Sequence, residues 1–490
     1  MDSQSSDSKN QDIVENKNLS IIQALIPVIA LVGMLAYNVF VFGDSSLDGS
    51  NQFILLMGAA VAMVIGFMNK VSYKTMVEEV SQNVKSTSTA LLILLMVGAL
   101  SGTWLISGII PTMIYYGLQI LNPTIFLAAC VIICAVLSIS IGSSWTTSAT
   151  VGIALIGIAK VLDVSLGMTA GAILSGAYFG DKLSPLSDTT NLAPVMAGTD
   201  LFTHIRYMMY TTIPSFVVAL LVFIIIGFSL DSNGQANSAE ILAAIDSTFL
   251  ITPWLFLVPA FVIFLIIKKT PPLIALLAGT LIAAVLALLL QPDLILIVAE
   301  ESIWNLKNAY KGILNAITIS IQIPTDFAIL EKLFSAGGMA GMLPTIWLII
   351  CAMVFGGVMD AIGALARISE SLLKLFSSVF GLFASTVASC LAINLTASDQ
   401  YLAIVVPGKM FAKAYEEKGL APENLSRTLE DAGTVTSVLI PWNTCGAYHS
   451  GVLGVPVADY FFYAVFNYVS PFMTLLFAAF NIKIRQLKNN

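Results

Sequence analysis

Long apolar runs recur along the whole chain, and they constrain its fold more than any other feature. A helix needs about 20 apolar residues to cross the roughly 30 Å hydrocarbon core of a bilayer, and irregular backbone cannot face lipid there. The chain is 57% hydrophobic and 10% charged, whereas soluble domains carry about 25% charged residues. We therefore predict an all-α polytopic membrane protein with about 10 to 14 transmembrane helices. The clearest spans lie near Leu19–Phe42, Gln52–Asn69, Leu91–Ile110, Ile125–Ile141, Tyr207–Leu230, Trp254–Ile267, Leu273–Gln291, Pro344–Met359, Val379–Leu395 and Tyr460–Phe480.

Loop charge predicts the orientation, because Lys and Arg gather in cytoplasmic loops. The connections 43–51 and 231–246 contain neither residue, whereas lysines follow at 70, 74, 268 and 269 and the C-terminal tail is basic. We therefore expect both termini in the cytoplasm. The stretch 69–86 predicts a helix at the membrane surface. The expected organisation is a disordered cytoplasmic tail (1–18), a first transmembrane half (19–230), an external loop (231–252) and a second transmembrane half (253–490).

Composition excludes several classes of function. The 22 Lys and Arg residues are outnumbered by 29 Asp and Glu residues, so we expect no nucleic-acid partner. The five cysteines lie in apolar stretches and the two histidines lack the spacing of zinc ligands. The sequence also has no GxxxxGK[ST] phosphate loop. We therefore expect no enzyme, no resident metal and no cofactor.

The chain repeats itself weakly. A shift of about 256 residues aligns "IGSSWTTSATVG" (141–152) with "ASDQYLAIVVPG" (397–408), and it places Pro185 on Pro441. The Gly-rich segment 98–108 falls within about one residue of the segment 355–363. Three segments held in one register predict a duplicated architecture. Two halves that each contain a broken helix are typical of secondary transporters, whose site lies between the repeats.

Hydroxyl-rich segments interrupt apparent spans in both halves. "GSSWTTSAT" (142–150) and "LTASDQ" (395–400) cannot face lipid as irregular backbone, so we expect them to line a cavity inside the protein. The alternative is that their small residues simply pack between helices. The segment "GDKLSPLSDTT" (180–190) is also polar, and Pro185 prevents a regular helix through it. Oxygen-rich segments of this kind suit a small hard cation.

Isolated carboxylates inside a membrane are costly and mark candidate sites. Our candidate ion ligands are the carboxylates Asp360, Asp188 and Asp399 and the neutral residues Ser143, Ser144, Thr146, Ser187, Thr189, Asn443 and Thr444. Several alternatives remain open at this stage. Asp360 could instead meet water and pair with Arg367, and the adjacent Asp181 and Lys182 could pair at the membrane surface. Glu430 and Asp431 are ambiguous, because Arg427 could neutralise one of them.

Three segments carry a resemblance to a known family. They are "SGAYFGDKLSPLSDTTNLAPVMAGTDLFTHIRYMMYTTIPS" (175–215), "SRTLEDAGTVTSVLIPWNTCGAY" (426–448) and "GTWLISGIIPTMIYYGL" (102–118). The sequence closely resembles the NhaC family of bacterial sodium/proton antiporters over nearly its whole length. The resemblance implies inverted repeats with re-entrant hairpins in the bacterial inner membrane. It also implies exchange of external protons for internal Na⁺, with Li⁺ as an alternative cargo. The sequence leaves the oligomeric state open, and a homodimer is one alternative. Relatives often have Glu where this chain has Asp360.

Three rival functions are weighed against this hypothesis. The same family includes antiporters that move Na⁺ with a small carboxylate such as malate or lactate, which would need a buried cation such as Arg206, Arg367 or Arg427. A channel would need a repeated filter or a charged ring, and neither is visible. A membrane-embedded hydrolase would need a Ser/His or paired-Asp arrangement around the two histidines, which the sequence does not offer.

Overall fold

The computed structural model confirms the all-α membrane fold. It describes residues 14, 16, 18–42, 49–230, 238–325, 328–331, 333–374 and 378–487. The predicted tail (1–18) and the first part of the predicted external loop (231–237) therefore lie largely outside the described residues. Within the described residues, the strands are limited to a short antiparallel hairpin of β1 (Ile321–Gln322) and β2 (Ser335–Ala336).

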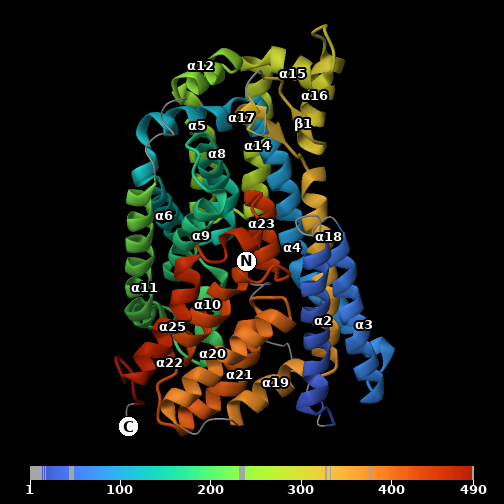
Figure 1. Ribbon diagram of the computed structural model, residues 1–490, viewed down its shortest axis with the longest axis vertical. Helices are drawn as coiled ribbons and strands as arrows, with labels where there is room; N and C mark the ends of the chain where they lie inside the picture. Colours follow the sequence, from blue (N-terminus) through green and yellow to red (C-terminus); the bar gives the residue numbers. More distant parts are fainter. Residues whose placement is uncertain are drawn as a thin grey trace.

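Helices account for almost all of the described chain (Figure 1). The first half contains α2 (Ile21–Phe42), α3 (Ser50–Met68), α4 (Tyr73–Ile106), α5 (Ile109–Ile120), α6 (Pro123–Ile141), α7 (Ser144–Thr147), η3 (Ser148–Gly152), α8 (Ile153–Val161), α9 (Leu166–Leu183), α10 (Asp188–Ala197) and α11 (Leu201–Ser229). The middle of the chain contains α12 (Ser238–Thr248), η5 (Pro253–Phe256), α13 (Leu257–Ile267), α14 (Pro272–Leu290), α15 (Pro292–Ala299), α16 (Leu306–Thr318) and α17 (Ala328–Glu331). The remaining helices are η6 (Ala340–Met342), α18 (Leu343–Ala361), α19 (Ala364–Lys374), α20 (Val379–Thr396), α21 (Leu402–Glu417), α22 (Glu423–Leu429), η7 (Glu430–Thr434), η8 (Ser437–Leu439), α23 (Thr444–Leu453), α24 (Val457–Tyr460) and α25 (Val465–Ala479).

The predicted spans are largely present, and Ser144–Val161, which was not among them, is also long and apolar enough to cross a membrane. Within the described residues, nine helices are long and apolar enough to cross a membrane, and the bent pair of α12 with η5 and α13 would make a tenth. The predicted surface helix 69–86 is helical from Tyr73 onward, and it is continuous with the following span in the 34-residue helix α4. No Gly or Pro lies between Tyr73 and Val97 to interrupt it. The last predicted span shortens to the 15 residues of α25, since 461–464 form a turn.

The two halves repeat the same order of elements in opposite directions. The shift of about 256 residues that aligns the sequence also places α6 on α20, α10 on α23 and α5 on α19. In Figure 1, α5 and α8 lie at the upper end of the molecule, whereas the corresponding α19 and α21 lie at the lower end. This inverted arrangement confirms the duplicated architecture that the sequence pattern predicts.

Small residues let the helices around the molecular centre approach closely. On α9, a Cβ atom added at Gly176 would lie 2.2 Å from the carbonyl oxygen of Val131, and one at Gly180 would lie 2.5 Å from that of Ala135. The hydroxyl of Ser138 on α6 also donates to the carbonyl of Ala177, at 2.6 Å. Such contacts between small residues are the usual basis of helix packing inside membranes. They fix the end of α9, where the polar segment 180–190 begins.

Candidate functional site

Four interruptions in the helices lie close together, where the two halves of the chain contact each other. We call residues 142–143 and 184–187 the first-half breaks, and residues 397–401 and 440–443 the second-half breaks. Each break follows the C-terminus of one helix and precedes the N-terminus of another: α6 and α7, α9 and α10, α20 and α21, η8 and α23. The breaks therefore present both free carbonyl oxygens, which favour a cation, and free N–H groups, which favour an anion.

Four of the candidate ligands predicted from sequence cap the helices that follow these breaks. Ser143, Ser187, Asp399 and Asn443 each accept a backbone N–H from the start of the next helix, at donor–acceptor distances of 2.8 to 3.4 Å. The repeat shift relates Ser143 to Asp399 and Ser187 to Asn443. Equivalent positions in the two halves thus cap the helix that follows each break. Asp399 is the charged residue among the four.

The first-half breaks lie against each other around Asp181. A Cβ atom added at Gly142, which has a φ of 77°, would lie 2.6 Å from that of Leu186. Both the backbone N–H and the hydroxyl of Ser144 donate to one carboxylate oxygen of Asp181, at 3.0 and 2.7 Å. The other predicted ligands of this half join the group, since Thr146 contacts the hydroxyl of Ser143 and Thr189 that of Ser187, each at 3.2 Å. Asp181 is buried and does not lie at the surface.

The second-half breaks are also held together. The backbone N–H of Thr444 donates to the carbonyl of Ser398 at 2.9 Å. The side-chain amide of Asn443 donates to Asn394 on α20, at 3.1 Å. These bonds place the predicted ligands Asn443 and Thr444 beside the segment that contains Asp399.

Aromatic side chains connect the two halves at the breaks. The ring of Trp145 on α7 stacks on that of Tyr448 on α23, with 4.0 Å between centroids. Tyr401 lies within electrostatic range of Asp181, Asp188 and Asp399. Both Tyr401 and Asp188 have exposed side chains. Since an exposed carboxylate would be costly in lipid, we interpret this face of the breaks as open to water.

Asp360 stands apart from the other candidate ligands. It lies near the C-terminal end of α18, within electrostatic range of Glu79 on α4. Among the described residues, no hydrogen bond links its carboxylate to any of the breaks. One helical turn earlier, a Cβ atom added at Gly356 would lie 2.2 Å from the carbonyl of Ala397, so α18 itself contacts a second-half break. Arg367, the alternative partner of Asp360, instead pairs with Glu370 at 2.9 Å.

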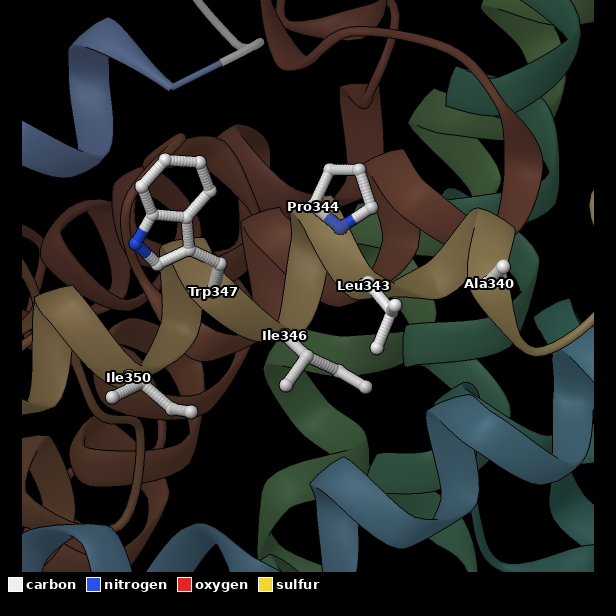
Figure 2. Close-up of a pocket in the computed structure, with 6 residues that line it drawn as sticks. All are labelled: Ala340, Leu343, Pro344, Ile346, Trp347 and Ile350. Atoms are coloured by element: carbon white, nitrogen blue, oxygen red, sulfur yellow. The ribbon is translucent and has the colours of Figure 1, made fainter.

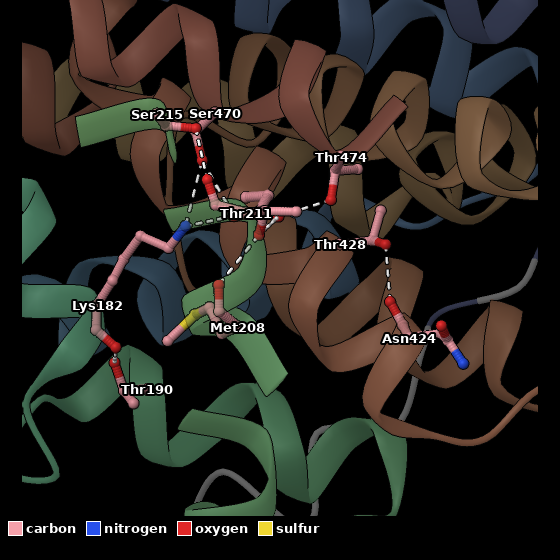
Figure 3. A network of polar contacts seen from close by, with 10 residues as sticks. Lys182, Thr190, Met208, Thr211, Ser215, Asn424, Thr428, Ser470 and Thr474 are labelled. Atoms are coloured by element: carbon pink, nitrogen blue, oxygen red, sulfur yellow. Dashed lines mark hydrogen bonds and ion pairs between the residues drawn. The ribbon is translucent and has the colours of Figure 1, made fainter. Parts of the chain in front are cut away.

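A fully buried ion pair was not expected from the sequence. Lys182 at the end of α9 pairs with Asp431 of η7, and both side chains have zero exposure. Three hydroxyls surround the carboxylate: Ser470, Thr211 and Thr474 donate to it at 3.0, 2.8 and 2.6 Å. Figure 3 shows Lys182 extending toward Ser470 and Thr211, while its backbone carbonyl accepts from Thr190. The pair therefore joins the first-half break 184–187 to α11 and α25.

The arginines also differ from the alternatives drawn from sequence. Asp431 pairs with Lys182 and not with Arg427. Arg427 is fully buried and its guanidinium carbon lies 4.6 Å from the ring centroid of Tyr207, with none of its nitrogens hydrogen-bonded within the described residues. Arg206 is exposed. Two features of the sequence pointed to the buried cluster around Lys182 and Asp431. They are a lysine among the small residues of α9 and the adjacent acidic residues 430–431.

Two hollows lie away from these polar groups. One, of about 540 Å³, lies on the outer face of α18, and Figure 2 shows its lining of Ala340, Leu343, Pro344, Ile346, Trp347 and Ile350. This lining offers no charged or hydroxyl side chain for an ion. The other, of about 290 Å³, lies between α4, α8, the β-hairpin and the end of α23, and it includes Ser101, Lys160 and Ser335. It is therefore the polar hollow of the two, and both halves contribute to it.

Comparisons with known proteins agree with this architecture. Residues 176–482 match the sequence profile of the Na⁺/H⁺ antiporter family. The chain belongs to this family. It is 36% identical over 430 residues to the Na⁺/H⁺ antiporter NhaC of Alkalihalophilus pseudofirmus, covering 88% of this chain and 90% of that protein.

Two further relatives have different names. The malate-2H⁺/Na⁺-lactate antiporter of Bacillus subtilis is 36% identical over 467 residues, which cover 94% of this chain and 93% of that protein. The arginine/ornithine antiporter ArcD of Halobacterium salinarum is 33% identical over 472 residues, which cover 95% of this chain and 93% of that protein. Similarity of this degree therefore extends to antiporters of both inorganic ions and small organic ions.

Proposed function

We propose that this family member is a secondary Na⁺/H⁺ antiporter that exchanges internal Na⁺ for external protons by alternating access. The observation that carries the proposal is the meeting of helix breaks from two inverted halves around buried carboxylates and hydroxyls. Broken helices at a repeat interface are where secondary transporters bind their ions. Membership of the family and the similarity to NhaC support the same cargo. Such a carrier needs neither a cofactor nor a chemical conversion of its cargo.

Sodium would bind to oxygen atoms at the breaks. We propose Asp188 and Asp399 as carboxylate ligands and Asp360 as a further carboxylate on the adjoining helix α18. Ser143, Ser144, Thr146, Ser187, Thr189, Asn443 and Thr444 would complete the coordination through hydroxyl, amide and carbonyl oxygens. Binding of either H⁺ or Na⁺ reduces the charge of the site, and only a nearly neutral site crosses the low-dielectric interior cheaply. Competition between the two cations for the same carboxylates would then couple their opposite movements.

The distribution of charge supports an orientation in a bacterial inner membrane. The lower end of Figure 1 contains α19, α21 and the C-terminus, which carry Arg367, Lys374, Lys413 and Arg485. The upper end contains α12, which has two acidic residues and no basic residue, and α16, whose Lys311 pairs with Glu301 and whose other basic residue is Lys307. Because Lys and Arg favour cytoplasmic loops, we propose that the lower end and both termini face the cytoplasm.

A Na⁺-coupled carboxylate antiporter is the second candidate, and two observations favour it. Four helices begin at the breaks. The N-terminus of a helix attracts the carboxylate of an anionic substrate. The malate-2H⁺/Na⁺-lactate antiporter is as similar in sequence as NhaC. Arg427, the buried arginine on α22, could balance an organic anion if a path reached it.

One flux experiment distinguishes these candidates. The purified protein is reconstituted in liposomes containing a pH-sensitive dye, and Na⁺, Li⁺ or K⁺ is added first alone and then with malate or lactate. A pH change driven by Na⁺ without any organic acid is expected for the Na⁺/H⁺ antiporter. A response that requires the organic acid would overturn that proposal in favour of the second candidate.

A further inference from the structure

Glu430 is a buried carboxylate that forms no ion pair among the described residues. It is the first residue of η7, and its side chain has no solvent exposure. Among the residues that the structure describes, it is the buried carboxylate whose two oxygens both lack a hydrogen-bond partner. The hydroxyl of Thr434, one turn later, lies within reach of this carboxylate, but neither group makes a hydrogen bond of normal geometry. An ionised carboxylate in such surroundings is costly unless a proton or another cation neutralises it.

The neighbouring charges leave Glu430 uncompensated. Lys182, Asp181 and Asp431 lie within electrostatic range of it. The ammonium of Lys182 is already engaged by Asp431, whose carboxylate receives three further hydroxyl hydrogen bonds. Asp181 receives two hydrogen bonds from Ser144. When all three carboxylates are ionised, this cluster holds three negative charges against one positive charge, so it can take up two monovalent cations before it becomes neutral.

The backbone around Glu430 connects it to a second-half break. Residues Glu430–Thr434 form a single wide helical turn of the π type, a feature found often at functional sites. The carbonyl of Gly433 in this turn accepts from the amide of Asn394 at 2.7 Å, and Asn394 in turn accepts from Asn443 at 3.1 Å. A change of charge at Glu430 is therefore linked through two hydrogen bonds to a residue proposed to bind Na⁺.

We propose that Glu430, and not the Na⁺-binding carboxylates at the breaks, carries the transported proton. This inference rests on the proposed antiport, and it replaces direct competition for the same carboxylates by exchange between two linked positions. In the outward-facing state the ionised carboxylate takes a proton from outside. In the inward-facing state it releases that proton to the cytoplasm as Na⁺ binds at the breaks, and the neutralising charge passes from H⁺ to Na⁺. Asp431 takes no part in this exchange, because Lys182 and three hydroxyls already satisfy its carboxylate. The two adjacent acidic residues thus have different roles set by their partners.

The test compares Glu430→Gln with a matched control, Glu423→Gln. Gln keeps the size of the side chain but cannot release a proton. Glu423 lies seven residues earlier in the same helical segment and pairs with Arg485 at 2.7 Å, outside the cluster. We expect Na⁺-driven proton flux in liposomes to fall to the level of empty vesicles for Glu430→Gln and to stay at the wild-type level for Glu423→Gln. Exchange of ²²Na⁺ for Na⁺, which needs no proton, should continue in Glu430→Gln and become independent of pH.

The outcomes separate this inference from the proposed function. Wild-type protein without Na⁺-driven proton flux would overturn the proposed function. If the wild-type protein is active and Glu430→Gln retains the same Na⁺-driven proton flux with the same pH profile, only the role of Glu430 is overturned. If Glu430→Gln fails to insert, Glu430→Asp provides the test, because a shorter acid should retain flux with a displaced pH profile. An unchanged profile in that variant would likewise contradict the proposal.

Discussion

The buried pair of Lys182 and Asp431 allows a quantitative test of what holds the two halves together. Its residues are separated by 249 positions in sequence, and both are fully buried. Removing one member of such a pair leaves an uncompensated charge and costs about 3–5 kcal/mol. A single side-chain hydrogen bond inside a membrane protein contributes only about 0.6 kcal/mol. The two effects should therefore be distinguishable by mutation.

We expect Asp431→Asn and Lys182→Met each to lower the free energy of unfolding by about 3–5 kcal/mol. Asn keeps the shape of Asp and can still accept from the surrounding hydroxyls, so most of this loss comes from the unpaired ammonium. The double variant removes both charges of the pair and leaves Asp181 and Glu430 beside it. Its loss should be clearly smaller than the sum of the two single losses. Thr474→Val removes one hydrogen bond of 2.6 Å to the same carboxylate and should cost about 0.6 kcal/mol.

Reversible unfolding in mixed detergent and SDS micelles measures these four free energies on the full-length chain. The difference between the double variant and the sum of the single variants gives the coupling energy of the pair. A coupling energy near zero, or single losses no larger than that of Thr474→Val, would refute the electrostatic account. The pair would then be an ordinary packing contact.

Three further predictions address packing, the site and the contact between the halves. Gly102→Ala should destabilise the fold by about 1–3 kcal/mol or more, because the new Cβ would lie 1.8 Å from the carbonyl oxygen of Ala316; unchanged unfolding would show that α4 and α16 separate easily. Asp360→Asn should abolish Na⁺-driven proton flux in liposomes while the protein still inserts and elutes as folded material, and retained flux would remove Asp360 from the site. Trp145→Ala should lower the free energy of unfolding by about 0.5–1.5 kcal/mol more than the loss of buried area alone would, because it removes the stack on Tyr448. A loss no larger than the buried area explains would argue against this contact as a link between the halves.

The lengths of the apolar runs predicted most of the fold. The structure differs from them at α4 and α25, and both differences have physical reasons. Apolar runs locate spans because each span has to match the same bilayer thickness. The charges of 70–85 favoured a helix at the membrane surface. Because no Gly or Pro occurs between Tyr73 and Val97, this helix continues into the following span as α4. The end of α25 shows the reverse case, in which an apolar run of sufficient length contains a turn before Val465.

The candidate site was predicted in its local parts but not in its long-range contacts. Ser143, Ser187, Asp399 and Asn443 were predicted as oxygen donors because they lie in polar interruptions of apolar runs, and the structure shows that each of them caps a helix at one of the breaks. Which acidic residue meets which cation depends on the packing of α9, α11 and α25, and no local pattern encodes that packing. Sequence alone therefore left Lys182 at the membrane surface as an open alternative, although its side chain is fully buried.

The inverted order of the two halves has a consequence for the energies of the two facing states. If the halves had identical sequences, exchanging their shapes would turn an outward-open molecule into an inward-open one of equal energy. Ser143 and Asp399 occupy equivalent capping positions, but only the second is charged. Such differences between paired positions make the two states unequal, and the populations of the states follow from that inequality. The positions at which the two halves differ in sequence therefore determine whether the outward-open or the inward-open state is more populated.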